Sequence, residues 1–139
     1  MYTLEAEAHF DAAHFLAGYH GTCENLHGHR WRVVAQISAD ELQTDGDERG
    51  MVCDFAAFKS ELARVVREYD HTFIVEEGTL RRETLDALAA EGFTLKVVAW
   101  RTTAENFARA IACELEAAGL PVTQVEVDET PANRAVWRR

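Results

Sequence analysis

The chain has 139 residues, 47% of them hydrophobic and 27% charged, and its 24 acidic against 14 basic side chains give a formal net charge of −10. This composition excludes an intrinsically disordered chain, and the length fits one domain over residues 1–139. The excess of acidic residues argues against nucleic-acid binding, which requires a concentrated basic surface. No apolar run approaches the ~20 residues that span a bilayer, the N-terminus does not resemble a signal peptide, and the cysteines are odd in number, so we expect a cytoplasmic protein with reduced thiols.

The N-terminal half is predicted to begin with two strands. Residues 2–12 alternate between apolar and polar side chains, and residues 29–38 do the same, which is typical of strands with one buried face. Asp54 then stands at the N-cap position of a helix over 55–70, whose apolar residues recur with helical spacing. A shorter helix is predicted at 79–91, because Gly92 follows it as a stop signal.

The C-terminal half is predicted to contain one long helix between short strands. The strands are expected at 95–100, 122–127 and 135–137, and the helix at 103–118. We find no internal repeat and no linker. The order of elements predicts an α+β fold in which helices cover one face of an antiparallel sheet.

Histidines are concentrated near the N-terminus, where five of the six lie within the first 29 residues. His27 and His29 are two residues apart at the start of a strand, so they share one face, and that face also carries Trp31 and Val33. His14 continues the buried face of the first strand. A single inward histidine would be a hydrogen-bonded core residue, but three that converge suit Zn²⁺ with an open fourth position, as in a catalytic zinc site.

Two further groups near the strand ends are candidates for proton transfer. Cys23 precedes His27 by four residues on a loop, where a nearby cation would favour its thiolate; the alternative is a small buried apolar side chain. Asp70 adjoins His71, and a carboxylate beside an imidazole orients it and raises its basicity. Taken alone, this dipeptide is also typical of the end of a helix with a surface histidine.

Two glutamates are candidates for binding. Glu105 follows Thr103 in the first turn of a predicted helix, a place that the helix dipole already favours for an acid. Glu129 ends a strand on its buried side. A carboxylate there needs a partner, and a ligand with paired N–H donors would provide one.

With these residues in place, the sequence resembles the 6-pyruvoyltetrahydropterin synthase/6-carboxytetrahydropterin synthase family. The matching segments, in family order, are Phe10–His14, Cys23–His29, Asp54-Phe55 with Lys59, Asp70-His71, Thr103–Asn106 and Glu129-Thr130. Together they extend over nearly the whole chain. The resemblance implies the tunnelling fold (T-fold), a four-stranded antiparallel sheet with two helices on one face. It also implies a homohexamer, a dimer of trimers, with active sites between subunits.

The same resemblance assigns roles to these residues. The three converging histidines would bind zinc, Cys23 would be the proton-abstracting base, and Asp70 with His71 would form a proton relay. The pterin pocket would be lined by Thr103, Glu105 and Glu129, of which Glu129 would anchor the amino-pyrimidine edge.

The implied substrate is 7,8-dihydroneopterin triphosphate. The Cys-x3-His spacing resembles that of the bacterial branch, which forms 6-carboxy-5,6,7,8-tetrahydropterin and acetaldehyde on the route to 7-deazaguanine nucleosides such as queuosine. The chain departs from the family at Glu24, at Thr102 in place of the usual proline, and in an insertion over 76–101. Glu24 keeps open an aldolase-like cleavage to 6-hydroxymethyl-7,8-dihydropterin for folate. A 6-pyruvoyl product also stays open, as does a catalytically inactive pterin- or zinc-binding module.

Overall fold

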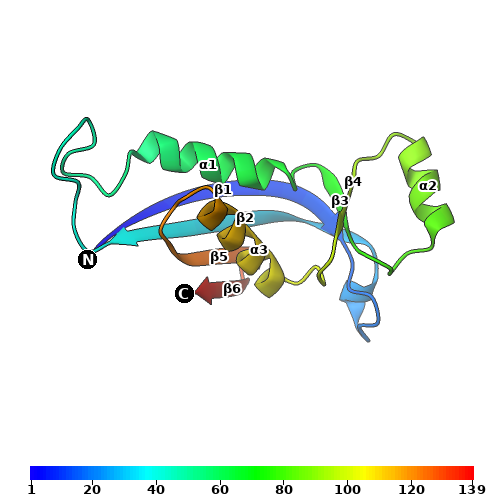
Figure 1. Cartoon of the computed structure of the whole chain (residues 1–139). Helices are drawn as coiled ribbons and strands as arrows, with labels where there is room; N and C mark the ends of the chain where they lie inside the picture. The colour runs from blue at the N-terminus through cyan, green and yellow to red at the C-terminus, as the bar shows by residue number, and fades with distance from the viewer.

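The computed structural model describes all of residues 1–139, and a long curved sheet forms its framework (Figure 1). The sheet has six strands in the order β4-β3-β1-β2-β5-β6. The strands are β1 (Tyr2–His14), β2 (His27–Ala39), β3 (Thr72–Glu76), β4 (Leu95–Val98), β5 (Val122–Thr130) and β6 (Asn133–Arg138). No helix is long and apolar enough to cross a membrane.

The predicted four-stranded antiparallel sheet is confirmed as the β1-β2-β5-β6 part of this larger one. The correction lies at one edge, where β3 pairs parallel with β1 and β4 pairs parallel with β3. The strand β3 was not predicted. Its sequence is a short apolar run, Thr-Phe-Ile-Val-Glu, without the alternation that marks a half-buried antiparallel strand.

Two helices pack on the sheet. Helix α1 (Phe55–Arg67) lies along β1, and helix α3 (Ala104–Ala117) lies against β5 and β6. The predicted cap of α1 is present, because Asp54 accepts the backbone N–H of Ala57 at 3.0 Å. Thr103 caps α3 in the same way and accepts the backbone N–H of Asn106 at 3.4 Å. Helix α2 (Arg82–Ala90) buries no residue and stands apart at one end of the molecule (Figure 1).

The core lies between the sheet and the two packed helices. An aromatic cluster occupies its end nearest the histidines and consists of Phe10, Trp31, Tyr69 and Phe107, each at most 2% exposed. The rings of Trp31 and Phe107 lie 4.6 Å apart, and Trp31 lies 4.9 Å from the ring of His14. The packing of these rings therefore holds the first turn of α3 against the last residues of β1.

On the other face of the sheet, an ion-pair network joins three strands. Asp128 on β5 is 5% exposed, and it accepts hydrogen bonds from Arg134 on β6 at 2.7 and 3.0 Å and from Arg32 on β2 at 3.2 Å. These bonds, that of Arg134 above all, hold the pKa of Asp128 below its ordinary value.

This lowered pKa predicts an acid-dependent stability. Because the folded state favours the ionised carboxylate, Asp128 stabilises the fold above its unfolded pKa of about 4 and ceases to do so as the pH falls through the folded value. An Asp128→Asn variant should therefore be much less stable than the parent at pH 7, and the difference should shrink towards pH 3. Urea unfolding at several pH values measures it, with the exposed Asp40→Asn as the control. A difference that did not change with pH would contradict the prediction.

Candidate functional site

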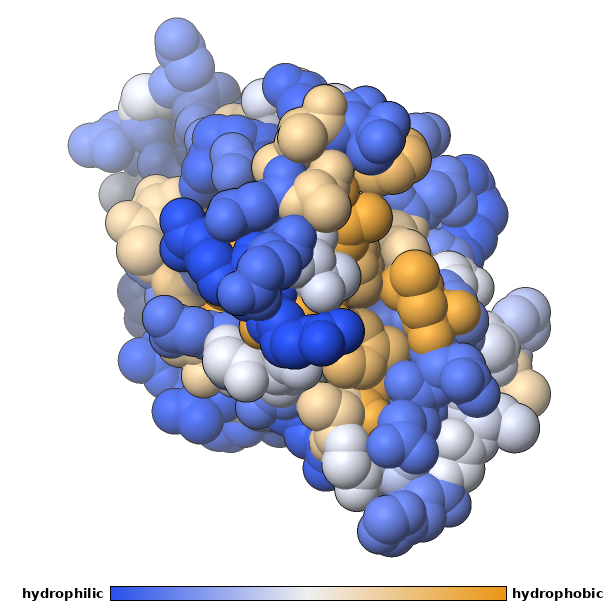
Figure 2. All heavy atoms as spheres, turned by 90° about the vertical axis from the view of Figure 1, so that its right-hand side faces the viewer, coloured by the Kyte–Doolittle hydropathy of each residue, from blue (hydrophilic) through white to orange (hydrophobic).

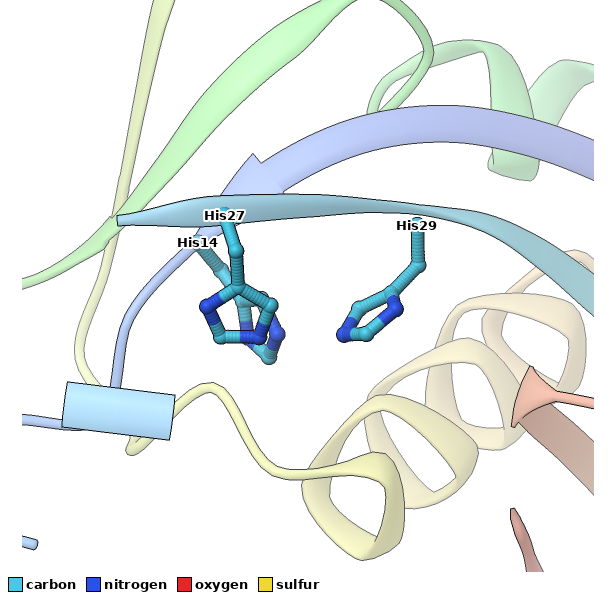
Figure 3. Close-up of side chains that lie close together, drawn as sticks. All are labelled: His14, His27 and His29. Atoms are coloured by element: carbon cyan, nitrogen blue, oxygen red, sulfur yellow. The ribbon is translucent and has the colours of Figure 1, made fainter. Parts of the chain in front are cut away.

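The end of β1 and the start of β2 bring the three predicted histidines together. His14 pairs directly with His27 in the antiparallel register, and His29 follows two residues later on the same face. One ligand atom from each imidazole lies within 4.8 Å of the others. Figure 3 shows the three rings pointing into one space, with the 3₁₀ turn at Thr22–Glu24 and the start of α3 beyond it. The predicted convergence is confirmed.

Backbone carbonyls determine which nitrogen of two rings is free. Nδ1 of His14 lies 2.8 Å from the carbonyl of Thr102, and Nδ1 of His27 lies 2.6 Å from that of Asn25. A carbonyl only accepts, so each Nδ1 carries the proton and each Nε2 keeps its lone pair. The Nε2 atoms of all three histidines are buried without a hydrogen-bond partner. Three buried imidazole nitrogens that face one space are an arrangement that can hold a metal ion.

The electrostatics of the cluster favour the neutral form of two of the three rings. Burial, together with the neighbouring imidazoles, lowers the pKa of His14 to about 4. Burial also lowers the pKa of His29. Neutral imidazole is the form that binds metals, and three imidazoles with space for a fourth ligand fit a catalytic zinc site. His14, His27 and His29 are thus the residues that would hold the ion.

The remaining pocket candidates surround an open cavity of about 320 Å³. Its walls include Cys23, Thr103, Glu105 and Glu129, which come from the 3₁₀ turn, the start of α3 and the end of β5. Burial raises the pKa of the Glu129 carboxyl. Glu24 is exposed and is not among the lining residues. Of the two neighbouring candidates for the reactive group, the structure therefore places only the thiol in the pocket.

Asp70 and His71 contact each other, and His71 lines a different pocket. Asp70 Oδ2 is 2.9 Å from His71 Nδ1, and this contact raises the pKa of His71. Asp70 also accepts the N–H of Asp11 at 2.8 Å, while His71 donates its N–H to the Asp11 carbonyl at 2.7 Å. This pair of hydrogen bonds to β1 holds His71 at a φ of 55°, in the left-handed region.

The second pocket, of about 300 Å³, is lined by His71 and by apolar residues that include Leu26, Leu88 and Phe93. Leu26 and Phe93 are each 61% exposed. Figure 2 looks onto the end of the molecule that carries α2 and shows hydrophobic surface between hydrophilic residues there. Within one chain, Cys23 and His71 therefore line two different pockets.

Two contributions to the site were missed in the sequence. Tyr19 lines the Cys23 pocket, and nothing in its loop sequence signals this. Thr102, whose place in the family pattern is usually proline, is fully buried against His14. Its hydroxyl donates to the Phe15 carbonyl at 3.0 Å, while its oxygen lies 3.3 Å from His14 Nδ1. The sequence shows the departure from proline, but it does not show that Thr102 contacts His14, which lies 88 positions away.

This contact predicts a role for Thr102 in metal affinity. A Thr102→Val variant keeps the shape of the side chain but loses the hydroxyl that ties the segment before α3 to β1 and the His14 ring. Because the Thr102 carbonyl remains as the partner of His14 Nδ1, we expect its zinc affinity to fall by up to about 10-fold, the lower end of the range for a lost partner of a metal-bound histidine. Competition with a chromogenic chelator measures the change. Thr102→Ser restores the hydroxyl and should bind zinc like the parent; equal affinities for all three proteins would disprove the role.

Comparison with known proteins agrees with this geometry. Residues 3–139 match the family model of 6-pyruvoyl tetrahydropterin synthase. A protein of Haemophilus influenzae named 6-carboxy-5,6,7,8-tetrahydropterin synthase is 36% identical over 137 residues, which cover 96% of each chain. A protein of Synechocystis with the same name is 34% identical over 137 residues, covering 97% of this chain and 92% of the relative.

Solved structures show the same fold at lower identity. The 6-pyruvoyl tetrahydropterin synthase of Caenorhabditis elegans superposes with a TM-score of 0.71 at 23% identity, covering 99% of this chain and 95% of its own. That of Plasmodium vivax, in a variant whose catalytic glutamate is replaced by alanine, gives a TM-score of 0.70 at 20% identity, covering 99% and 97%. The predicted T-fold is thereby confirmed.

Proposed function

Because the chain belongs to the 6-pyruvoyl tetrahydropterin synthase family, we propose that it is a zinc-dependent lyase acting on 7,8-dihydroneopterin triphosphate. Its products are 6-carboxy-5,6,7,8-tetrahydropterin, acetaldehyde and triphosphate, and its place is in the formation of 7-deazaguanine nucleosides such as queuosine. The observation that carries the proposal is the set of three buried, unpartnered Nε2 atoms beside the pocket of Cys23 and Glu129. The names of the bacterial relatives support the 6-carboxy product.

The pocket residues divide the chemistry between binding and proton transfer. Glu129 accepts the paired N–H donors of the amino-pyrimidine edge, which supplies the partner that its half-buried carboxylate lacks. Cys23 removes a proton from the substrate side chain, which extends towards the histidines. Zinc held by the three histidines would lower the pKa of substrate hydroxyls and would stabilise the negative charge that develops on the side chain.

The second proton-transfer group comes from a neighbouring copy in this proposal. Asp70 orients His71 and raises its pKa, and the side chain of His71 is 79% exposed, so the imidazole is open to a partner. Since Cys23 and His71 of one chain line different pockets, a complete site needs the His71 of another subunit beside the Cys23 of the first. The proposed homohexamer, with active sites between subunits, satisfies this requirement.

Glu24 remains the basis of the second candidate, aldolase-like cleavage to 6-hydroxymethyl-7,8-dihydropterin. A glutamate is the catalytic residue replaced in the Plasmodium vivax protein, which has this fold. Here Glu24 is exposed and lies outside the residues that line the Cys23 pocket. The position of the thiol therefore favours the 6-carboxy product.

Product analysis tests the proposal. Zinc-loaded protein is given 7,8-dihydroneopterin triphosphate, released aldehyde is trapped, and the pterin is identified by mass spectrometry. A 6-carboxypterin with acetaldehyde is the expected result. A 6-hydroxymethyl product would transfer the catalytic role to Glu24, a 6-pyruvoyl product would change the reaction type, and binding without turnover would indicate an inactive pterin-binding module.

A further inference from the structure

The carboxyl group of Glu129 faces the histidine cluster at distances longer than a hydrogen bond. Its Oε1 lies 3.6 Å from Nε2 of His14 and 3.8 Å from Nε2 of His29. His14 carries its proton on Nδ1, so its Nε2 presents a lone pair towards the carboxyl group. Neither Nε2 atom has a hydrogen-bond partner. The carboxyl oxygen and the two nitrogens therefore face one space as atoms that one metal ion could bind.

The separations match those between neighbouring ligands of one metal ion. In a tetrahedral zinc site with bonds of about 2.0–2.1 Å, adjacent ligand atoms lie about 3.3 Å apart. The two oxygen–nitrogen distances exceed this value by a few tenths of an ångström. Small side-chain movements would therefore bring the carboxylate oxygen to the position that three histidines leave open.

The backbone directs Glu129 to this place. The pairing of β5 with β6 shifts register between Asp128 and Thr130, so Glu129 lies in an irregularity of the ladder. Such irregularities re-aim side chains beside active sites. The neighbouring Asp128 is taken up by Arg32 and Arg134 on the other face, whereas Glu129 contacts only imidazoles among charged partners. Its carboxylate is thus free for the cluster.

We propose that Glu129 is a fourth ligand of the metal in the resting enzyme, and that a bound pterin draws the carboxylate away. This inference rests on the proposed function, because the same carboxylate anchors the amino-pyrimidine edge there. One group then serves two partners in turn. The fourth position of the metal is closed while the pocket is empty and opens to the substrate hydroxyls only when a pterin ring is in place.

Cobalt substitution tests the ligand directly, because the visible absorption of Co²⁺ depends on its ligand set. The Co²⁺ spectrum of Glu129→Ala should differ from that of the parent. The metal affinity of the variant should fall by about tenfold or more, because losing a ligand costs at least as much as losing a residue that hydrogen-bonds to a ligand. Glu105→Ala removes another carboxylate of the same pocket and should leave the pterin-free spectrum unchanged. Identical spectra and affinities for the parent and Glu129→Ala would overturn the proposal.

Unsubstituted pterin tests the displacement. It has the amino-pyrimidine edge but no side-chain hydroxyls, so any spectral change on binding reports the loss of Glu129 and not a new ligand from the substrate. Saturating pterin, verified by fluorescence, should shift the Co²⁺ spectrum of the parent towards that of Glu129→Ala. An unchanged spectrum at saturation would disprove the displacement. A shift without turnover of the triphosphate substrate would leave this inference standing while the proposed reaction fails.

Discussion

A Cys23→Ala variant is expected to keep its fold and its metal but to lose turnover by about 10²- to 10⁴-fold, the usual contribution of one general acid or base. Cys23 is the only thiol among the residues that line the pocket of Glu129. Its backbone carbonyl accepts the N–H of Leu16 at 2.8 Å, so the loop is held by a bond that the substitution leaves in place. The loss should therefore be chemical and not structural.

The measurement compares kcat, zinc content and circular dichroism of Cys23→Ala with those of the parent. Cys113→Ala is the control, because Cys113 is an exposed residue of α3 that does not line the pocket, and the variant should be fully active. Turnover that survived in Cys23→Ala with zinc bound would exclude the thiol as the base. A Glu24→Ala variant assayed beside it shows whether the neighbouring carboxylate has taken that role.

A Phe107→Ala variant is expected to lower the free energy of unfolding by about 3–5 kcal/mol, as is typical when a buried phenylalanine is truncated. Phe107 is fully buried, and its ring lies close to the rings of Phe10, Trp31, Tyr69 and Trp100, at 5.9, 4.6, 5.6 and 4.9 Å. Removing the ring opens a cavity between α3 and the sheet. The neighbouring side chains are held by other contacts, so they can fill this cavity only in part.

Urea unfolding of the metal-free proteins measures this loss without a contribution from metal binding. Phe93→Ala is the matched control, since the same side chain is 61% exposed there and its removal should change the unfolding free energy by less than about 0.5 kcal/mol. A loss below about 1 kcal/mol for Phe107→Ala would show that this part of the core closes around the cavity.

The sequence predicted the parts of the fold and site that depend on local periodicity. The alternation of residues 2–12 and 29–38 marked β1 and β2, and the same period of two placed the histidines on one face. It also placed Glu129 on the buried side of β5. These features follow from the alternation of side chains along a strand and from the antiparallel pairing of strands that are neighbours in the sequence. Both can be inferred from short segments of the chain.

The parts that were not predicted depend on contacts between distant segments. The parallel strand β3 is a five-residue apolar run that carries no alternation. The bond of His14 to Thr102 joins residues 88 positions apart, and the bonds of Asp70 and His71 to Asp11 also join distant parts of the chain. The separation of the His71 pocket from the Cys23 pocket likewise follows from tertiary packing, which no motif encodes.

The long reach of the Thr102 contact has a consequence for how the protein matures. His14, His27 and His29 all belong to one hairpin near the start of the chain, so a ribosome exposes every nitrogen ligand before it has synthesised the segment that orients the first ring. If the three histidines hold zinc as proposed, the nascent hairpin would bind the ion only weakly, because nothing yet fixes which nitrogen of His14 carries the proton. Tight retention of the metal would then report that the C-terminal half has docked.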